Sequence, residues 1–255
     1  MAGARKACSV AAVAAALVAG CGGDDAPAPT ASKPTAMATA TATPTPAPTE
    51  APPNAPAAKD VKLRATDGEP VRGRYTAAGR DAPAVLLLHQ SDGGVNQMDP
   101  LVPYLHAAGY ATLAYQSRPS PMEAERLPDA LGALRWLRDR PDVDPERLAL
   151  VGASIGASTT VLAMATKART TVDAAVALSP ADSSDIWALQ DDDRYRPHDV
   201  LFITDDSEAA SAEGMLEGAV RSELVRSQGP GHGIALVSEQ GVRDALLGWL
   251  DHRVR

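Results

Sequence analysis

The sequence has few cysteines, few aromatic residues and no excess of positive charge. Its two cysteines, Cys8 and Cys21, both lie near the N-terminus, so the rest of the chain cannot form a disulfide framework or a cysteine-based zinc site. Aromatic residues make up only 4% of the chain, so aliphatic residues and alanine must build the core. The formal net charge of -8 argues against nucleic-acid binding, because an acidic chain does not complement a phosphate backbone. No apolar run reaches the roughly 18 residues of a membrane-spanning helix.

The first 20 residues have the pattern of a bacterial secretion signal. Arg5 and Lys6 give a positive start, and the apolar run that follows, 9–20, is too short to span a bilayer. The run ends in Leu-Val-Ala-Gly before Cys21, which resembles the lipobox of bacterial lipoproteins, in which the cysteine is lipidated and becomes the first mature residue. We therefore expect a lipid anchor at Cys21 and an extracytoplasmic protein held on a bacterial membrane. The alternative is an ordinary secretory peptide with an incidental cysteine.

Residues 21–59 form a segment rich in alanine, proline and threonine. Nine of the 21 prolines lie between Pro27 and Pro56. Such a composition cannot bury enough apolar surface to offset chain entropy, so we expect a disordered, semi-extended tether. At about 3.1 Å per residue it could hold a domain up to about 110 Å from its anchor.

Residues 60–255 alternate between strand and helix patterns. Successive β-α units predict an α/β fold, with a mostly parallel sheet of about eight strands flanked by helices on both faces. Connections are short, so no large cap domain is expected. The predicted strands are 61–66, 71–76, 84–88, 110–115, 148–152, 172–178, 200–204 and 223–225, and the predicted helices are 101–108, 127–140, 155–166, 209–219 and 240–252.

The motif that carries chemistry is Gly-x-Ser-x-Gly, centred on Ser154. It follows a predicted strand and precedes a predicted helix. A sharp strand-to-helix turn needs glycine two residues on either side of the serine, and it exposes the hydroxyl at the helix N-terminus, where the amide of Ile155 is free to bind an oxyanion. The alternative is a small-residue turn in which the serine caps the helix.

At these residues the sequence resembles the α/β-hydrolase superfamily and, within it, the dienelactone-hydrolase-like esterases. The resemblance covers nearly all of 60–255 and includes Val-Leu-Leu-Leu-His at 85–89, Asp-Pro-Glu-Arg-Leu-Ala-Leu-Val-Gly at 144–152 and the Gly-His-Gly around His232. In the family, His-Gly-x follows the third strand, and the amide of x is the second oxyanion donor. This chain has Gln at position 90, so the resemblance implies the amide of Ser91 as that donor, with the Gln90 amide as the fallback.

The expected catalytic base is His232. Of the five histidines it alone lies between glycines in a late loop, with a closing helix to follow, and the family's base lies there. The flanking glycines let the backbone bend so that the ring reaches the carboxyl edge of the sheet. A loop histidine without a role is the alternative.

The expected acid follows the strand 200–204, where Asp205 and Asp206 stand side by side. The family's usual spacing favours Asp206 over Asp205. Asp182 and Asp185 are outside candidates. The run of three aspartates at 191–193 is expected to be a solvated loop rather than a metal site.

These residues together predict a serine hydrolase that cleaves carboxylic esters with a triad of Ser154, Asp206 and His232. The mechanism requires no organic cofactor and no metal. The expected partners are a small-molecule ester and the membrane, the latter through Cys21. A surface binding module with little or no turnover, a serine peptidase and a thioesterase are the alternatives. The physiological substrate and the oligomeric state stay open.

Overall fold

The computed structural model describes residues 54, 56–91, 93–166, 168, 171–192 and 194–254. The expected signal peptide, the lipidated Cys21 and nearly all of the expected tether lie outside the described residues. The first strand begins at Lys59, one residue before the start of the expected domain of 60–255.

The described chain folds around one eight-stranded sheet, ordered β1-β2-β4-β3-β5-β6-β7-β8. The first hairpin and the β2–β4 pair are antiparallel, whereas every pair from β4 to β8 is parallel. The expectation of about eight mostly parallel strands is confirmed. The strands are β1 (Lys59–Arg64), β2 (Pro70–Thr76), β3 (Ala82–Leu88), β4 (Ala111–Tyr115), β5 (Val143–Ala153), β6 (Ala174–Leu178), β7 (Val200–Thr204) and β8 (Glu223–Arg226).

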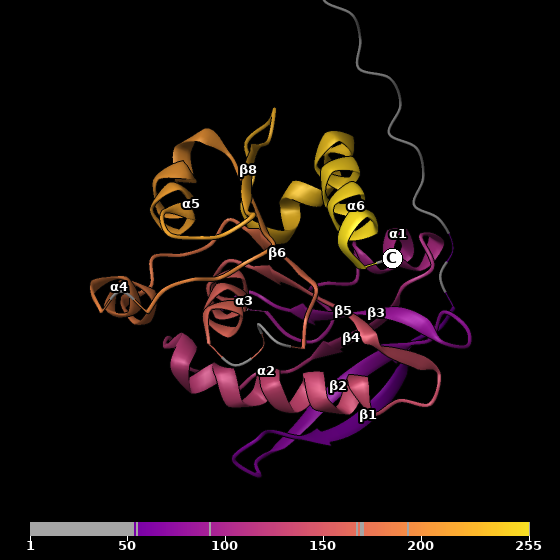
Figure 1. The fold of residues 1–255 in the computed structure, drawn as a ribbon. Coiled ribbons are helices and arrows are strands. Elements are labelled where there is room, and N and C mark those ends of the chain that lie inside the picture. Colours follow the sequence, from indigo (N-terminus) through magenta and orange to yellow (C-terminus); the bar gives the residue numbers. More distant parts are fainter. Residues whose placement is uncertain are drawn as a thin grey trace, which may run out of the picture. The chain divides into compact units, whose positions relative to one another are not determined.

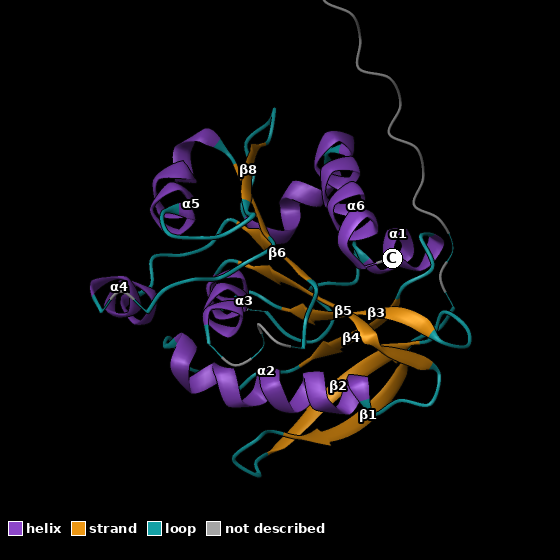
Figure 2. Ribbon diagram, in the orientation of Figure 1, coloured by secondary structure: helices purple, strands orange, loops and turns teal. Residues whose placement is uncertain are grey.

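Helices cover both faces of the sheet, as Figures 1 and 2 show. The central strands are buried on both sides: Leu150 packs in one core and its neighbour Val151 in the other. Among the described residues no helix is long and apolar enough to cross a membrane. One face carries α2 (Glu123–Arg138), α3 (Ile155–Ala165), α4 (Ser184–Asp191) and α5 (Ala209–Leu216), the other carries α1 (Val102–Ala107) and α6 (Gln240–Val254), and the short 3₁₀ helices are η1 (Asp206–Glu208) and η2 (Gly233–Ser238).

Two helices differ most from the sequence prediction. Helix α2 begins at Glu123, four residues earlier than predicted, and continues through Pro128. The Pro128 carbonyl accepts a hydrogen bond from the Thr66 N–H at 3.0 Å, so this part of the helix is tied to the turn after β1. Helix α4 was not predicted. Its first turn is capped by Ser183, whose hydroxyl accepts the Ile186 N–H at 3.3 Å.

We expect opposite effects on stability from one substitution at two helical glycines. A Cβ on Gly132 would overlap the Arg64 carbonyl and lie 2.6 Å from Ala65 Cα, whereas a Cβ on Gly248 would meet no atom within 4 Å. Gly132→Ala should therefore lower the free energy of unfolding by about 1–3 kcal/mol. Gly248→Ala should raise it by about 0.5–1 kcal/mol, because alanine is the better helix former. Urea denaturation measures both, and equal effects would contradict the packing described here.

Candidate active site

Ser154 lies in a strained turn between β5 and α3. Its backbone has φ 54° and ψ -121°, a conformation that costs a side-chain-bearing residue about 1–3 kcal/mol and persists only where the surroundings enforce it. The turn is tied to the next strand, because the Ser154 N–H donates to the Leu178 carbonyl at 2.9 Å. The predicted strand–serine–helix arrangement is therefore present, and it presents the serine at the carboxyl edge of the sheet.

The two glycines of the motif are required by close backbone approach. A Cβ on Gly152 would overlap the Gly156 carbonyl and lie 2.5 Å from Thr160 Oγ1. A Cβ on Gly156 would overlap the Leu88 carbonyl and lie 2.6 Å from that of His89. The start of α3 therefore packs directly against the end of β3, and the loop after β3 begins next to the turn that carries Ser154.

The two expected oxyanion donors come from these two segments. Ile155 is the first residue of α3, so its N–H has no partner within the helix. The Ser91 N–H makes no hydrogen bond to any residue that the structure describes. The fallback donor is occupied, because the Gln90 N–H donates to Gln97 Oε1 at 2.8 Å. The geometry therefore favours Ser91 over Gln90 for this role.

A buried polar network supports the loop after β3. His89 is 4% exposed, and its Nε2 accepts the Ser117 N–H at 3.1 Å. Since Nε2 accepts, the ring proton must be on Nδ1, which donates to the Gln90 carbonyl at 2.6 Å. The Ser117 hydroxyl also contacts Arg126, which is 3% exposed, and burial lowers the pKa of that guanidinium. Sequence reasoning did not find this network.

His232 contacts a carboxylate that the sequence analysis did not consider. Its Nδ1 lies 2.8 Å from both Oε1 and Oε2 of Glu208. Glu208 ends the short helix η1, which begins directly after Asp205. A carboxylate at Nδ1 leaves Nε2 as the nitrogen that can accept a proton.

Asp206, the expected acid, does not reach His232. It is largely exposed, and its carboxylate pairs with Arg226 Nη1 at 2.7 Å. Of the outside candidates, Asp185 caps α2 by accepting the Ala124 N–H at 2.9 Å, and Asp182 is exposed. The structure brings Glu208 to His232 instead, because the 3₁₀ turn folds the chain back after the strand. The spacing Asp-x-x-Glu, a signature of a capped helix start, was the signal that could have indicated this turn.

Asp205 holds this region together through the backbone. Its Oδ1 accepts the N–H groups of Ser207 and Glu208, and its Oδ2 accepts the Gly231 N–H at 3.0 Å. The hydroxyl of Ser207 also donates to it at 2.7 Å. The bonds from Ser207 and from the Gly231 amide hold the pKa of this carboxyl below its usual range. Asp205 thus fixes both the turn that carries Glu208 and the loop that carries His232.

Ser154 and His232 lie at the same edge of the sheet but are not hydrogen-bonded in this structure. The Ser154 hydroxyl makes no hydrogen bond to any described residue, although it follows β5 and His232 follows β8 at the carboxyl ends of parallel strands. Catalytic hydrogen bonds are commonly long before substrate binds. Within the described chain, no group of three or more His, Cys, Asp or Glu side chains could hold a metal ion.

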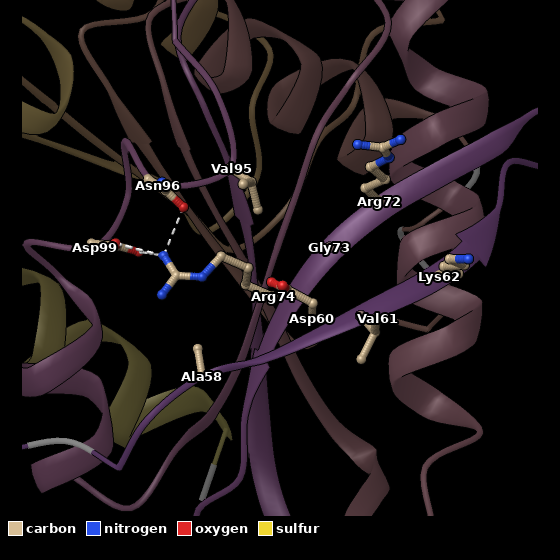
Figure 3. Close-up of a pocket in the computed structure, with 10 residues that line it drawn as sticks. All are labelled: Ala58, Asp60, Val61, Lys62, Arg72, Gly73, Arg74, Val95, Asn96 and Asp99. Atoms are coloured by element: carbon tan, nitrogen blue, oxygen red, sulfur yellow. Dashed lines mark hydrogen bonds and ion pairs between the residues drawn. The ribbon is translucent and has the colours of Figure 1, made fainter.

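A groove of about 810 Å³ lies elsewhere, lined by the β1–β2 hairpin and by residues of the loop after β3. Figure 3 shows Arg74 crossing it to Asn96 and Asp99, and Arg74 Nη1 lies 2.6 Å from Asp99 Oδ2. Arg74, one of the three cationic residues that line the groove, is therefore already paired. Neither Ser154 nor His232 lines it, so we place the candidate site at the carboxyl edge of the sheet.

The fold of the chain is similar to that of several solved structures. The chain is similar to the esterase Pf2001 of Pyrococcus furiosus, with 16% identity and a TM-score of 0.65 over 78% of this chain and 93% of that one. It is also similar to a dienelactone hydrolase from Anabaena variabilis, with 18% identity and a TM-score of 0.61 over 78% and 99% of the two chains. The thermophilic carboxylesterase EstE1, cloned from a metagenomic library, has 19% identity and a TM-score of 0.61 over 78% and 89%. The chain thus has the α/β-hydrolase fold.

Sequence relatives match a shorter stretch. The uncharacterized protein Rv2307c of Mycobacterium tuberculosis is 33% identical over 114 residues, which are 42% of this chain and 41% of that protein. The uncharacterized protein YfhR of Escherichia coli K12 is 30% identical over 115 residues, 41% and 40% of the two chains. The match thus spans about two-fifths of the length of these relatives. No family model matches the chain.

The lowered pKa of Asp205 predicts how stability depends on pH. A carboxyl with a depressed folded-state pKa stabilises the fold above its unfolded pKa of about 3.9, and this contribution is lost as the pH falls through the lower folded value. Asp205→Asn should therefore be less stable than wild type at neutral pH, and the difference should shrink below about pH 4, where the protonated acid resembles the amide. Urea denaturation between pH 7 and pH 3 measures this, and a difference independent of pH would contradict it.

Proposed function

We propose that this protein is a serine hydrolase that cleaves carboxylic esters through an acyl-enzyme on Ser154. The observation that carries the proposal is the strained turn at Ser154, which presents the hydroxyl at the carboxyl edge of the sheet that also receives His232 and its carboxylate partner. Strain of this kind is enforced by glycines on both sides of the turn, so it is built into the fold rather than incidental. The similarity to esterase structures supports the same reaction class.

The proposed chemistry follows from the geometry of the side chains. Glu208 accepts a hydrogen bond from the Nδ1–H of His232 and stabilises the charged ring, so Nε2 can remove the Ser154 proton as Oγ attacks the ester carbonyl. The amides of Ile155 and Ser91 hold the oxyanion. His232 then returns the proton to the leaving alcohol, and water hydrolyses the acyl-enzyme by the same steps. Thioesters and lactones offer the same carbonyl to this site.

A binding module without turnover is the second candidate. The observation that favours it is the missing hydrogen bond between Ser154 and His232 in the described chain. A fluorophosphonate probe separates the two candidates, because only an activated serine reacts rapidly with it.

We also propose that the protein is anchored extracytoplasmically through a lipid on Cys21. The lipobox-like residues before Cys21, the positive start and the short apolar run support this. Cys21→Ser should move the protein from the detergent phase to the aqueous phase after expression in a host that processes lipoproteins, while ester hydrolysis by the folded domain is kept. Wild-type protein that stays aqueous would contradict the anchor.

The triad predicts a distinct pattern of mutant rates. Glu208→Gln should lower kcat for a short p-nitrophenyl ester by about 10²- to 10⁴-fold, because the amide no longer stabilises the charged ring or fixes its tautomer. Ser154→Ala and His232→Ala should each reduce turnover nearly to the level of the double variant, because the two residues act as a unit.

Asp206→Asn is the matched control for Glu208→Gln. It removes a carboxylate from the same short helix, but one that pairs with Arg226 at the surface, so kcat should change by less than about threefold. A larger loss from Asp206→Asn than from Glu208→Gln would restore Asp206 as the acid. Wild-type protein that neither hydrolyses an activated ester nor takes up the phosphonate would overturn the proposed function.

A further inference from the structure

Gln90 extends its side chain from the loop after β3 to the loop that carries His232. Its Oε1 accepts the Ile234 N–H at 2.8 Å, across 144 positions of sequence. The side chain lies directly over Gly233, where a Cβ would overlap Oε1 and stand 2.8 Å from Cδ. Gly233 has φ +56°, a backbone conformation that favours glycine. The absence of a side chain also leaves room for Gln90.

The hydrogen bond caps a helix that starts at the catalytic histidine. His232 is the N-cap residue of η2, and its own side chain makes no capping bond because it faces Glu208. The first N–H groups of a helix need acceptors from outside it. Gln90 supplies one to Ile234, two residues after His232, and so acts as a cap from a distant segment.

Gln90 is itself fixed by its backbone. Its N–H donates to Gln97 Oε1 at 2.8 Å, and its carbonyl accepts from His89 Nδ1 at 2.6 Å. His89 is in turn held by Ser117 in the buried network. Gln90, which caps η2, is thus held at the buried end of β3, beside the start of α3.

We propose that Gln90 is a positioning residue. It fixes the loop that carries His232 and so keeps the His232 ring in position to act on Ser154. The inference rests on the proposed function for its catalytic consequence. Three side chains from two segments then hold the loop: Asp205 accepts the Gly231 N–H before His232, Glu208 contacts the ring, and Gln90 accepts the Ile234 N–H after it. A glycine at position 90, as in the resembled family, could not accept the hydrogen bond from the Ile234 N–H.

The test compares Gln90→Met, which keeps the length but removes the acceptor, with Gln90→Glu, which keeps an acceptor. With a short p-nitrophenyl ester, Gln90→Met should lower kcat about tenfold or more with little change in KM, since a misplaced base slows the chemical step. Gln90→Glu should recover most of that loss. Gln190→Met is the control: Gln190 joins α4 to α5 through the Gly214 carbonyl, so its loss should affect stability but not kcat.

A double-mutant cycle separates positioning from direct contact with substrate. In a His232→Ala background, Gln90→Met should cost nothing further, because its effect passes through His232. An equal cost in both backgrounds would mean that Gln90 touches substrate or the oxyanion itself, and would overturn the inference. Wild-type kcat in Gln90→Met would overturn it too.

Amide hydrogen exchange gives a readout that does not depend on turnover. The Ile234 amide should exchange about tenfold faster in Gln90→Met than in wild type, and Gln90→Glu should restore its protection. If wild type proves inactive, the proposed function fails while accelerated exchange still supports the structural part of the inference. Unchanged exchange at Ile234 overturns the inference whether or not the wild type is an esterase.

Discussion

The close approach of α3 to the end of β3 is the constraint on which the rest of the site depends. Gly156 packs onto the carbonyls of Leu88 and His89 with no room for a side chain. Ser154 stands two residues before this contact, and its backbone is held in a strained turn with φ 54° and ψ -121°. Because the strain is maintained by backbone packing, the hydroxyl is presented without needing a partner of its own.

The other half of the site is a loop, and loops need external ties to hold a side chain precisely. The backbone around His232 is tied by side chains from two other segments, Asp205 after β7 and Gln90 after β3. Each of these side chains accepts a hydrogen bond from a backbone N–H that has no acceptor within the loop. His232 is therefore held at the same edge of the sheet as Ser154, which reduces the freedom of one side chain relative to the other.

The sheet, the turn at Ser154 and the loop at His232 were predictable from sequence because each depends on local patterns. Continuous apolar runs indicated buried parallel strands, and paired glycines indicated the sharp turn. The partner of His232 was not predicted, because counting from the end of β7 assumes an extended chain. Asp205 instead caps a 3₁₀ turn, and the turn carries Asp206 outward and Glu208 back to the ring. The role of Gln90 was also missed, since its contact joins segments far apart in sequence.

The pattern of satisfied and unsatisfied polar groups indicates where a ligand would bind. Buried polar groups in folded proteins nearly always have partners, and here Asp205 accepts the N–H groups of Glu208 and Gly231, while Gln90 accepts the N–H of Ile234. In the described part of the chain, the groups left without a partner at this edge include the Ser154 hydroxyl and the Ser91 N–H. In the proposed function the Ser154 hydroxyl is the nucleophile, and the N–H groups of Ser91 and Ile155 are the two oxyanion donors. Such a set complements a carbonyl group that becomes an oxyanion on attack, and a substrate with that group would supply the partners that the fold withholds.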